Sequence, residues 1–286
     1  MIADLSWLYD LLGSLPFAGL ETRFMQQALL GLLLLSPMTA MLGVHVLNFR
    51  MAFFSDAVGH SSFAGLALGL LLGAPPNMAV LVFGVLVGMA IMGVQRKSGL
   101  SADAAIGIVF SAVVAFGLAV VSRAPDLGKQ IQQYLYGDIL TVSEGELGIM
   151  AGLLIILIIF ELSGWNRMLF LSLSPVMAKV EGMATAFWQY LFAAILALVV
   201  MFSVRAVGVL LVTAMLVVPA ASGRNLARDM RGLFWWSIVI SIFSSVAGLL
   251  LSAQDWLATA SGATVILVAC LCFALSCIWK RIRQFK

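Results

Sequence analysis

The chain has 286 residues, of which 63% are hydrophobic and 10% are charged, and its formal net charge is +3. A soluble domain carries roughly a quarter charged residues, so this chain has too few polar side chains to cover a surface in water. The composition therefore excludes an ordinary soluble protein and indicates that lipid contacts most of the surface. The small positive charge lies in loops and at the C-terminus, which favours a role in membrane topology over nucleic-acid binding.

The apolar runs are about 20 residues long, which is the length of a membrane-spanning helix. They do not alternate with polar residues, as the strands of a membrane barrel would. The sequence therefore predicts an all-α, polytopic transmembrane helical bundle over residues 25–286, preceded by an interfacial segment at 1–24. Nine spans are expected, with eight as the alternative because the seventh is the shortest. They cover residues 25–46, 51–73, 77–95, 102–122, 146–163, 186–203, 206–222, 232–252 and 261–279.

Basic residues predict the orientation of the chain, because Lys and Arg collect in the cytoplasmic loops of membrane proteins. Predicted loops on one side of the membrane are basic, and so is the C-terminal tail. With nine spans, this bias places the C-terminus in the cytoplasm and the N-terminus outside. The basic residues on this side are Arg50, Arg96, Lys97, Arg167, Lys179, Arg224, Arg228, Arg231, Lys280, Arg281, Arg283 and Lys286.

The second predicted span contains a carboxylate and an imidazole one helical turn apart. Asp56 and His60 share a helix face, with Cβ atoms roughly 6 Å apart. Ionisable groups inside a span cost about 3 kcal/mol each and often mark a transport path. Carboxylate oxygen and imidazole nitrogen together suit Mn, Fe or Zn. Two ligands would hold such an ion loosely enough to release it, and a second copy of the chain could supply two more.

The pattern alone also allows a plainer interpretation, in which Asp56 is a helix N-terminal charge favoured by the helix dipole and His60 simply pairs with it. A stripe formed by Ser61, Gly65, Gly69 and Gly73 lies about 100° from this pair on a helical wheel. Small residues let helices approach closely in lipid, so we expect this stripe to pack on a neighbour while the ionisable pair faces a cavity.

Three other residues receive individual predictions. His45, alone on the first span, is expected to be a satisfied interior or interfacial residue. Asp103 is expected, with Ser101, to cap the start of a helix. Pro219 is expected to kink or end the seventh span and to act as a structural hinge.

A short helix is predicted near 174–182, on the cytoplasmic side between two spans. Ser174 can cap its start, Pro175 can be its first residue, and Gly182 can follow its end. About two helical turns are too few to be stable alone, so this element suits insertion into a groove of a partner or an amphipathic position on the membrane surface. Its apolar side chains are Val176, Met177 and Val180.

The sequence contains no Gly-x-x-x-x-Gly-Lys-Ser/Thr loop, so it does not bind ATP through a P-loop. Several blocks of residues do occur in a specific order and spacing. They are Arg50–Ala52 with Ser55, Asp56 and His60, then Asp103–Ile108 with Phe110 and Ser111, Tyr134–Asp138, Ser174–Gly182, Val207–Ala221 and Ser261–Ala263. Together they resemble the permeases of metal-ion ABC importers, the zinc, manganese and iron type, over about residues 15–280.

This resemblance implies a homodimer of permeases in the bacterial cytoplasmic (inner) membrane, with cytoplasmic P-loop ATPases docked on the short helices as coupling helices. It also implies an extracytoplasmic solute-binding protein that delivers the metal to a path lined by Asp56 and His60. No cofactor is implied other than the transported ion, and no ATPase site of the chain's own. Ser55 stands where glycine is usual and Gly59 where serine or alanine is usual, so the choice among Zn, Mn and Fe stays open.

Two rival functions remain at this point. An ion-coupled secondary transporter would show repeated halves and several intramembrane acids, whereas Asp56 is the one clear acid here and no repeat is visible. An ABC permease for an organic cofactor or a metal chelate would have a wide cavity, and the Asp56 and His60 side chains would be incidental to it.

Overall fold

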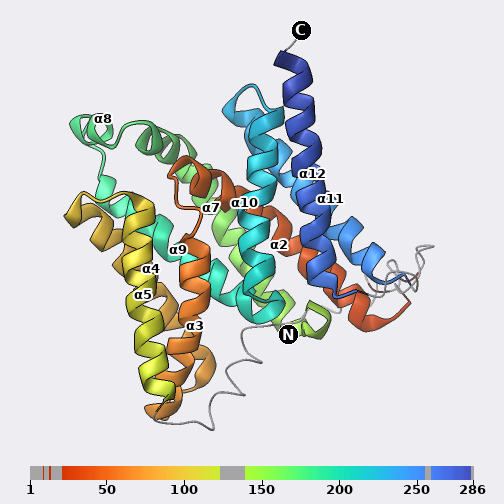
Figure 1. Cartoon of the computed structure of the whole chain (residues 1–286), viewed down its shortest axis with the longest axis horizontal. Coiled ribbons are helices and arrows are strands. Elements are labelled where there is room, and N and C mark those ends of the chain that lie inside the picture. Colours follow the sequence, from red (N-terminus) through yellow and green to blue (C-terminus); the bar gives the residue numbers. More distant parts are fainter. Residues whose placement is uncertain (1–8, 10–12, 14–20, 123–138, 255–258, 285–286) are drawn as a thin grey trace. The chain divides into compact units, whose positions relative to one another are not determined.

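The computed structural model describes residues 9, 13, 21–122, 139–254 and 259–284. Within these residues the chain is helical and contains no strand, which confirms the all-α prediction (Figure 1). The elements are α2 (Arg23–Asn48), α3 (Phe54–Leu71), α4 (Pro76–Ser98), α5 (Ala102–Val121), η1 (Ile139–Thr141), α7 (Glu144–Leu173), α8 (Pro175–Val180), α9 (Thr185–Val207), α10 (Val209–Leu226), α11 (Met230–Ser252) and α12 (Ser261–Gln284).

Each of the nine predicted spans falls on one of the long helices. Eight of these are long and apolar enough to cross a membrane. The exception is α3, because Asp56, His60 and three serines lower its mean hydropathy. The seventh predicted span, which the sequence suggested could be too short, corresponds to α10, and α10 is one of the eight helices that could cross a membrane. Most of the predicted interfacial segment 1–24 and all of the block Tyr134–Asp138 lie outside the described residues.

Local chemistry sets the ends of several helices. Pro76 begins α4, and Gly99 ends it with a left-handed φ of 66°. The Ser101 hydroxyl accepts a hydrogen bond from the Ala104 amide at 3.3 Å, as predicted for a cap, and Asp103 lies in the same first turn of α5. Asp229 caps α11 in the same way by accepting from the Gly232 amide at 2.8 Å. Such caps contribute about 1 kcal/mol each.

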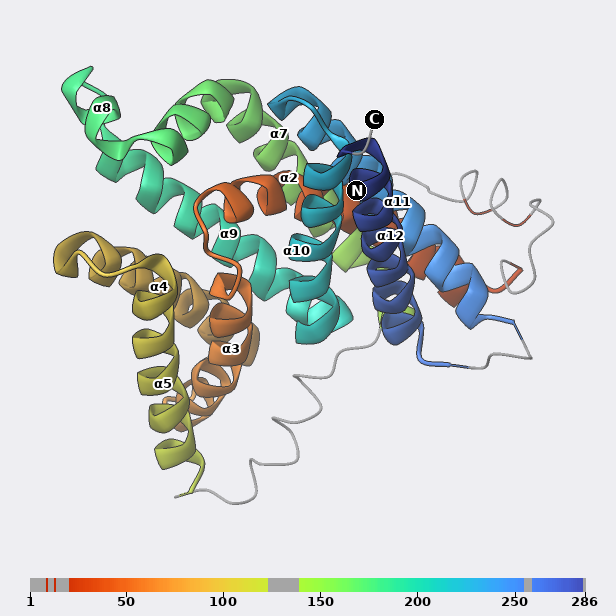
Figure 2. The same cartoon turned by 45° about the horizontal axis from the view of Figure 1, so that its top comes forward.

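The helices divide into two compact units, and α2, α7 and α10 contribute residues to both. One unit comprises residues 1–44, 138–158 and 214–286, and the other comprises residues 45–137 and 159–213. We call the second the α3 unit because it contains α3. In this unit α3, α4 and α5 run side by side (Figures 1 and 2), and α9 packs on α3 and α4.

Small residues allow this close packing, as the sequence predicts. A Cβ atom added to Gly65 would lie 2.9 Å from Cβ of Phe83, and one added to Gly88 would lie 2.9 Å from Cβ of Ala197. The stripe on α3 therefore faces α4, while the glycines of α4 face α9. Gly73 is an exception, because no atom lies within 4 Å of a Cβ added there, and its φ of 65° lies in the turn that follows α3.

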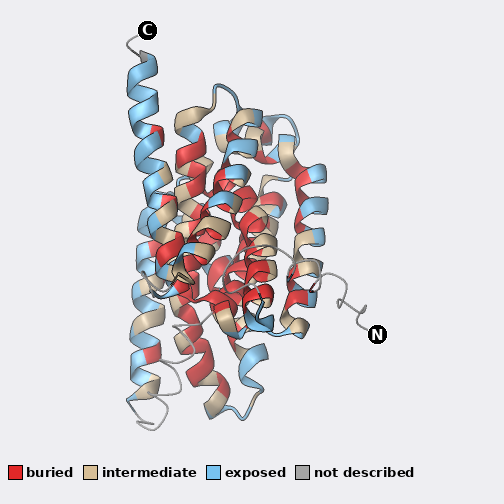
Figure 3. Ribbon diagram, turned by 90° about the vertical axis from the view of Figure 1, so that its right-hand side faces the viewer, coloured by how far each residue is buried: buried red, intermediate tan, exposed pale blue. Residues whose placement is uncertain are grey.

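In the other unit, buried serines link α2 to α11. The Ser36 hydroxyl donates to the Ser245 hydroxyl at 2.7 Å, and the Ser241 hydroxyl donates to the Ser36 carbonyl at 2.9 Å. These bonds satisfy polar groups where lipid offers no partner. Figure 3 shows exposed residues along much of α12, as expected for a helix that borders lipid.

Candidate functional site

A tight turn leads from α2 into α3 and sets the position of the ionisable pair. Arg50 has a left-handed φ of 57°, and its amide donates to the Leu47 carbonyl at 3.2 Å. The Met51 amide donates to the Val46 carbonyl at 2.9 Å, which completes a helix-ending motif of the Schellman type. Only residues 49–53 separate the two helices. Because Met51 is buried, this turn is fixed in the α3 unit.

Asp56 and His60 lie on one face of α3, as predicted. Nε2 of His60 lies 3.5 Å from Oδ1 of Asp56, and the two side chains are 41% and 38% exposed. Asp56 is in the first turn of α3, where the helix dipole favours a negative charge. The remaining polar side chains of α3, Ser55, Ser61 and Ser62, are buried. This pair is therefore the polar part of α3 that a small ion or another chain could reach.

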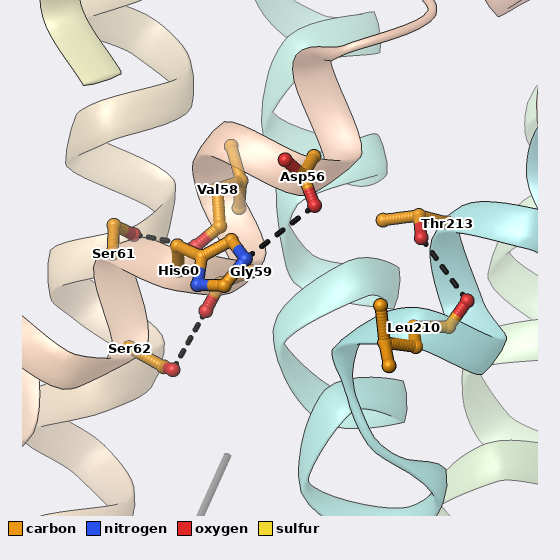
Figure 4. A network of polar contacts seen from close by, with 8 residues as sticks. All are labelled: Asp56, Val58, Gly59, His60, Ser61, Ser62, Leu210 and Thr213. Carbon is orange, nitrogen blue, oxygen red and sulfur yellow. Dashed lines mark hydrogen bonds and ion pairs between the residues drawn. The ribbon is translucent and has the colours of Figure 1, made fainter. Parts of the chain in front are cut away.

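Aromatic and aliphatic groups border the pair. The Phe110 ring of α5 meets the His60 ring edge-on, with 5.9 Å between centroids. At Gly59, between the two ionisable residues, an added Cβ would lie 3.1 Å from the side chain of Val209 on α10. Figure 4 shows the pair together with Leu210 and Thr213 from the beginning of α10, where the Thr213 hydroxyl donates to the Leu210 carbonyl at 3.1 Å.

The donor atoms of this pair suit a divalent transition metal, but they are few. One carboxylate and one imidazole match the ligand preference of Mn, Fe and Zn. Zinc sites in proteins are usually four-coordinate, with at least three protein ligands. Across the described ranges, no group of three or more His, Cys, Asp or Glu side chains could hold a metal ion. Among the described residues, one copy of the chain therefore supplies two candidate ligands here, Asp56 and His60.

The short helix predicted on the cytoplasmic side is present as α8. Ser174 accepts a hydrogen bond from the Met177 amide at 3.2 Å, Pro175 is the first helical residue, and Gly182 follows the end with a φ of 75°. The buried Ala178 anchors the helix. Its apolar side chains are exposed, at 72% for Val176, 55% for Met177 and 77% for Val180.

His45 is an interior residue, as predicted, but it is satisfied at only one ring nitrogen, and its partner was missed. Nε2 of His45 lies 3.0 Å from Oε2 of Glu161, and both side chains are buried. Glu161 lies near the end of the span predicted over residues 146–163, whereas α7 continues to Leu173. Glu161 is therefore a second acid inside a membrane-spanning helix. The expectation that Asp56 is the one clear intramembrane acid is wrong. The presence of an acid inside so long an apolar run could have indicated from the sequence that Glu161 has a buried partner.

Pro219 lies inside α10, which continues beyond it to Leu226. The proline therefore does not end the helix, and the alternative of an end at this residue is wrong. Its role as a hinge stays a prediction.

The fold and the ionisable pair together define a class of protein, the polytopic helical membrane protein with an ionisable pair on one largely buried helix. A family model described as the ABC 3 transport family matches residues 21–280. The chain belongs to the ABC 3 transport family, which confirms the resemblance seen in the sequence.

Individual relatives agree with this assignment. The chain is 32% identical over 257 residues to the high-affinity zinc uptake system membrane protein ZnuB of Haemophilus influenzae, covering 90% of this chain and 97% of the relative. It is 28% identical over 276 residues to the manganese transport system membrane protein MntC of Halalkalibacterium halodurans, covering 96% and 91%. Its fold matches the solved structure of PsaBC from Streptococcus pneumoniae in complex with Fab, with a TM-score of 0.76, 26% identity and coverage of 96% and 95%.

Proposed function

We propose that the chain is the membrane permease subunit of an ATP-driven ABC importer of divalent transition metal ions, namely Zn, Mn or Fe. The observation that carries this proposal is the partly exposed pair of Asp56 and His60 on the otherwise largely buried helix α3. Relatives named for zinc uptake and for manganese transport support the substrate class. The metal is cargo, and we expect no permanently bound cofactor.

A homodimer would complete the site. Two copies, each supplying Asp56 and His60, would offer two carboxylates and two imidazoles to one ion. The ions Zn, Mn and Fe lie between hard and soft, so a set of carboxylate and imidazole donors suits all three. Since each copy contributes only two ligands, separation of the two α3 helices would weaken the coordination and release the ion.

The transport cycle needs partners on both sides of the membrane. The basic loops and tail predict a cytoplasmic C-terminus and an outside N-terminus in the bacterial inner membrane. The exposed apolar side chains of α8 would dock a cytoplasmic P-loop ATPase, and a metal-binding solute-binding protein would deliver the ion from outside. ATP hydrolysis then belongs to a separate chain, in keeping with the lack of a P-loop motif in this sequence.

Substitution of the pair tests the proposal. Asp56→Ala and His60→Ala each remove one of the two ligands per copy, so we expect ATP-dependent zinc and manganese uptake to fall to background. Membrane insertion should persist, because both side chains are partly exposed and neither belongs to the buried core. Ser111→Ala is a matched control, since Ser111 is an exposed α5 residue bonded only to its own helix at 2.8 Å. Near-normal uptake by both variants would contradict the site.

One observation favours testing an ion-coupled secondary transporter. The structure adds the buried Glu161 to the intramembrane acids, and such acids are common in transporters of that type. Vesicles that contain only this chain, under a proton or sodium gradient and without ATP, distinguish the two functions. The proposal predicts no metal uptake in these vesicles. An ABC permease for an organic cofactor or a metal chelate would instead keep its uptake in Asp56→Ala.

A further inference from the structure

The His45 and Glu161 pair lies in the interior of the α3 unit, away from solvent. The side chains are 0% and 7% exposed, and the imidazole is enclosed by two aromatic rings. The Trp165 ring on α7 lies 5.3 Å from the His45 ring, and the Phe192 ring on α9 lies 5.9 Å from it, both edge-on. The contact therefore joins the last turn of α2 to the middle of α7 in an apolar setting.

Stability alone does not account for this pair. A buried pair of ionisable side chains loses its hydration, and replacing such a pair with apolar side chains of similar size is often neutral or stabilising. Nδ1 of His45 and Oε1 of Glu161 have no hydrogen-bond partner among the residues that the structure describes. Acids inside a span usually have a functional role for this reason.

On the His45 side, the pair is connected to the candidate metal site. The Phe49 amide donates to the His45 carbonyl at 2.9 Å, and the Arg50 turn follows directly. The Phe54 amide then donates to the Met51 carbonyl at 3.0 Å, which begins α3 in the same turn that contains Asp56. Because this connection is short and hydrogen-bonded, displacement of the end of α2 must displace the start of α3.

On the Glu161 side, the pair is connected to α8. From Glu161 the α7 helix runs without a break to Leu173, and α8 starts two residues later. Trp188 of α9 packs against this stretch of α7, with the Arg167 guanidinium 4.9 Å from its ring centroid and little room for any side chain at Gly164. The second half of α7 is therefore a continuous helix, packed against α9, that leads directly to α8. We call this part of α7, from Glu161 to Leu173, the arm of α7.

We propose that His45 and Glu161 are positioning residues that transmit movement of α8 to the Asp56 and His60 pair. Pulling α8 moves the arm of α7, the Glu161 contact carries the end of α2 with it, and the Arg50 turn shifts the first turn of α3. This inference rests on the proposed function, since it assigns α8 to an ATPase and α3 to the metal. It adds a mechanical connection between α8 and the Asp56 and His60 pair.

The double variant His45→Phe/Glu161→Leu tests the link. It replaces the polar contact with apolar packing of similar size, so the fold should persist while the directional bond is lost. The complex of permease and ATPase is reconstituted in proteoliposomes, and zinc uptake and ATP hydrolysis are measured together. We expect ATP hydrolysis and zinc binding to continue, while the number of ions imported per ATP falls about fivefold or more, the lower range of an ordinary coupling between sites.

Two further variants complete the experiment. Ser36→Ala/Ser245→Ala removes another buried polar contact of α2, outside the α3 unit, and should leave the ratio unchanged. Glu161→Gln keeps the shape but replaces the carboxyl group with an amide, which weakens the bond to His45, so an intermediate fall is expected.

An unchanged ratio in the assembled double variant, or in Glu161→Gln if the double variant does not assemble, would overturn the inference. Failure of both to assemble would assign the pair to folding and overturn it equally. Absence of ATP-dependent uptake by the wild-type complex would instead contradict the proposed function.

Discussion

The exposed face of α8 allows a quantitative prediction for the ATPase contact. Val176 and Met177 are 72% and 55% exposed. Full burial of such a side chain contributes about 2 kcal/mol, so covering these two fractions would contribute about 2.5 kcal/mol to docking. Because each 1.4 kcal/mol changes an affinity tenfold, Val176→Asp/Met177→Asp should weaken ATPase binding by about 60-fold or more.

The assay is co-purification of the ATPase with tagged permease from detergent-solubilised membranes, followed by titration of the binding affinity. The fold of α8 should persist, because its Ser174 cap and buried Ala178 are unchanged. Leu100→Asp is the control, since Leu100 is exposed between α4 and α5, on the side predicted to be cytoplasmic. Recovery of the ATPase with the double variant at the wild-type yield and affinity would refute the assignment of α8.

Two further predictions concern stability, measured by thermal unfolding in detergent. Gly43→Ala should destabilise the protein by about 1–3 kcal/mol, because its Cβ would collide with the Leu216 carbonyl oxygen. Gly107→Ala, where no atom lies within 4 Å, should be neutral or stabilising, and equal melting temperatures for the two variants would contradict the packing. Asp229→Ala should cost about 1 kcal/mol through loss of the α11 cap, and an unchanged melting temperature would show that the bond to the Gly232 amide contributes nothing.

Much of the fold could be predicted from the sequence, because lipid leaves the backbone few alternatives. Apolar runs must be helical in a bilayer, so every predicted span falls on a helix. The ends of α8 depend on Ser174, Pro175 and Gly182 themselves and could be predicted locally. The pairing of Asp56 with His60 follows from their spacing in one helix.

The features that were missed depend on contacts between distant segments. Glu161 is separated from His45 by 116 positions, and its burial depends on the continuation of α7 to Leu173. No periodicity in either segment indicates that the two will meet. Gly73 fits the stripe of small residues by spacing, but the chain turns at this residue. Glycine is favoured there because it adopts a left-handed conformation easily, and not because its small size lets two helices approach.

The amount of metal bound by the purified complex tests the central claim most directly. The account predicts one zinc or manganese ion for every two permease chains, measured by mass spectrometry of the metal after removal of free ions. It also predicts that this ion is lost in both Asp56→Ala and His60→Ala, while the dimer and its ATPase remain assembled. Retention of a stoichiometric ion by either assembled variant would contradict it.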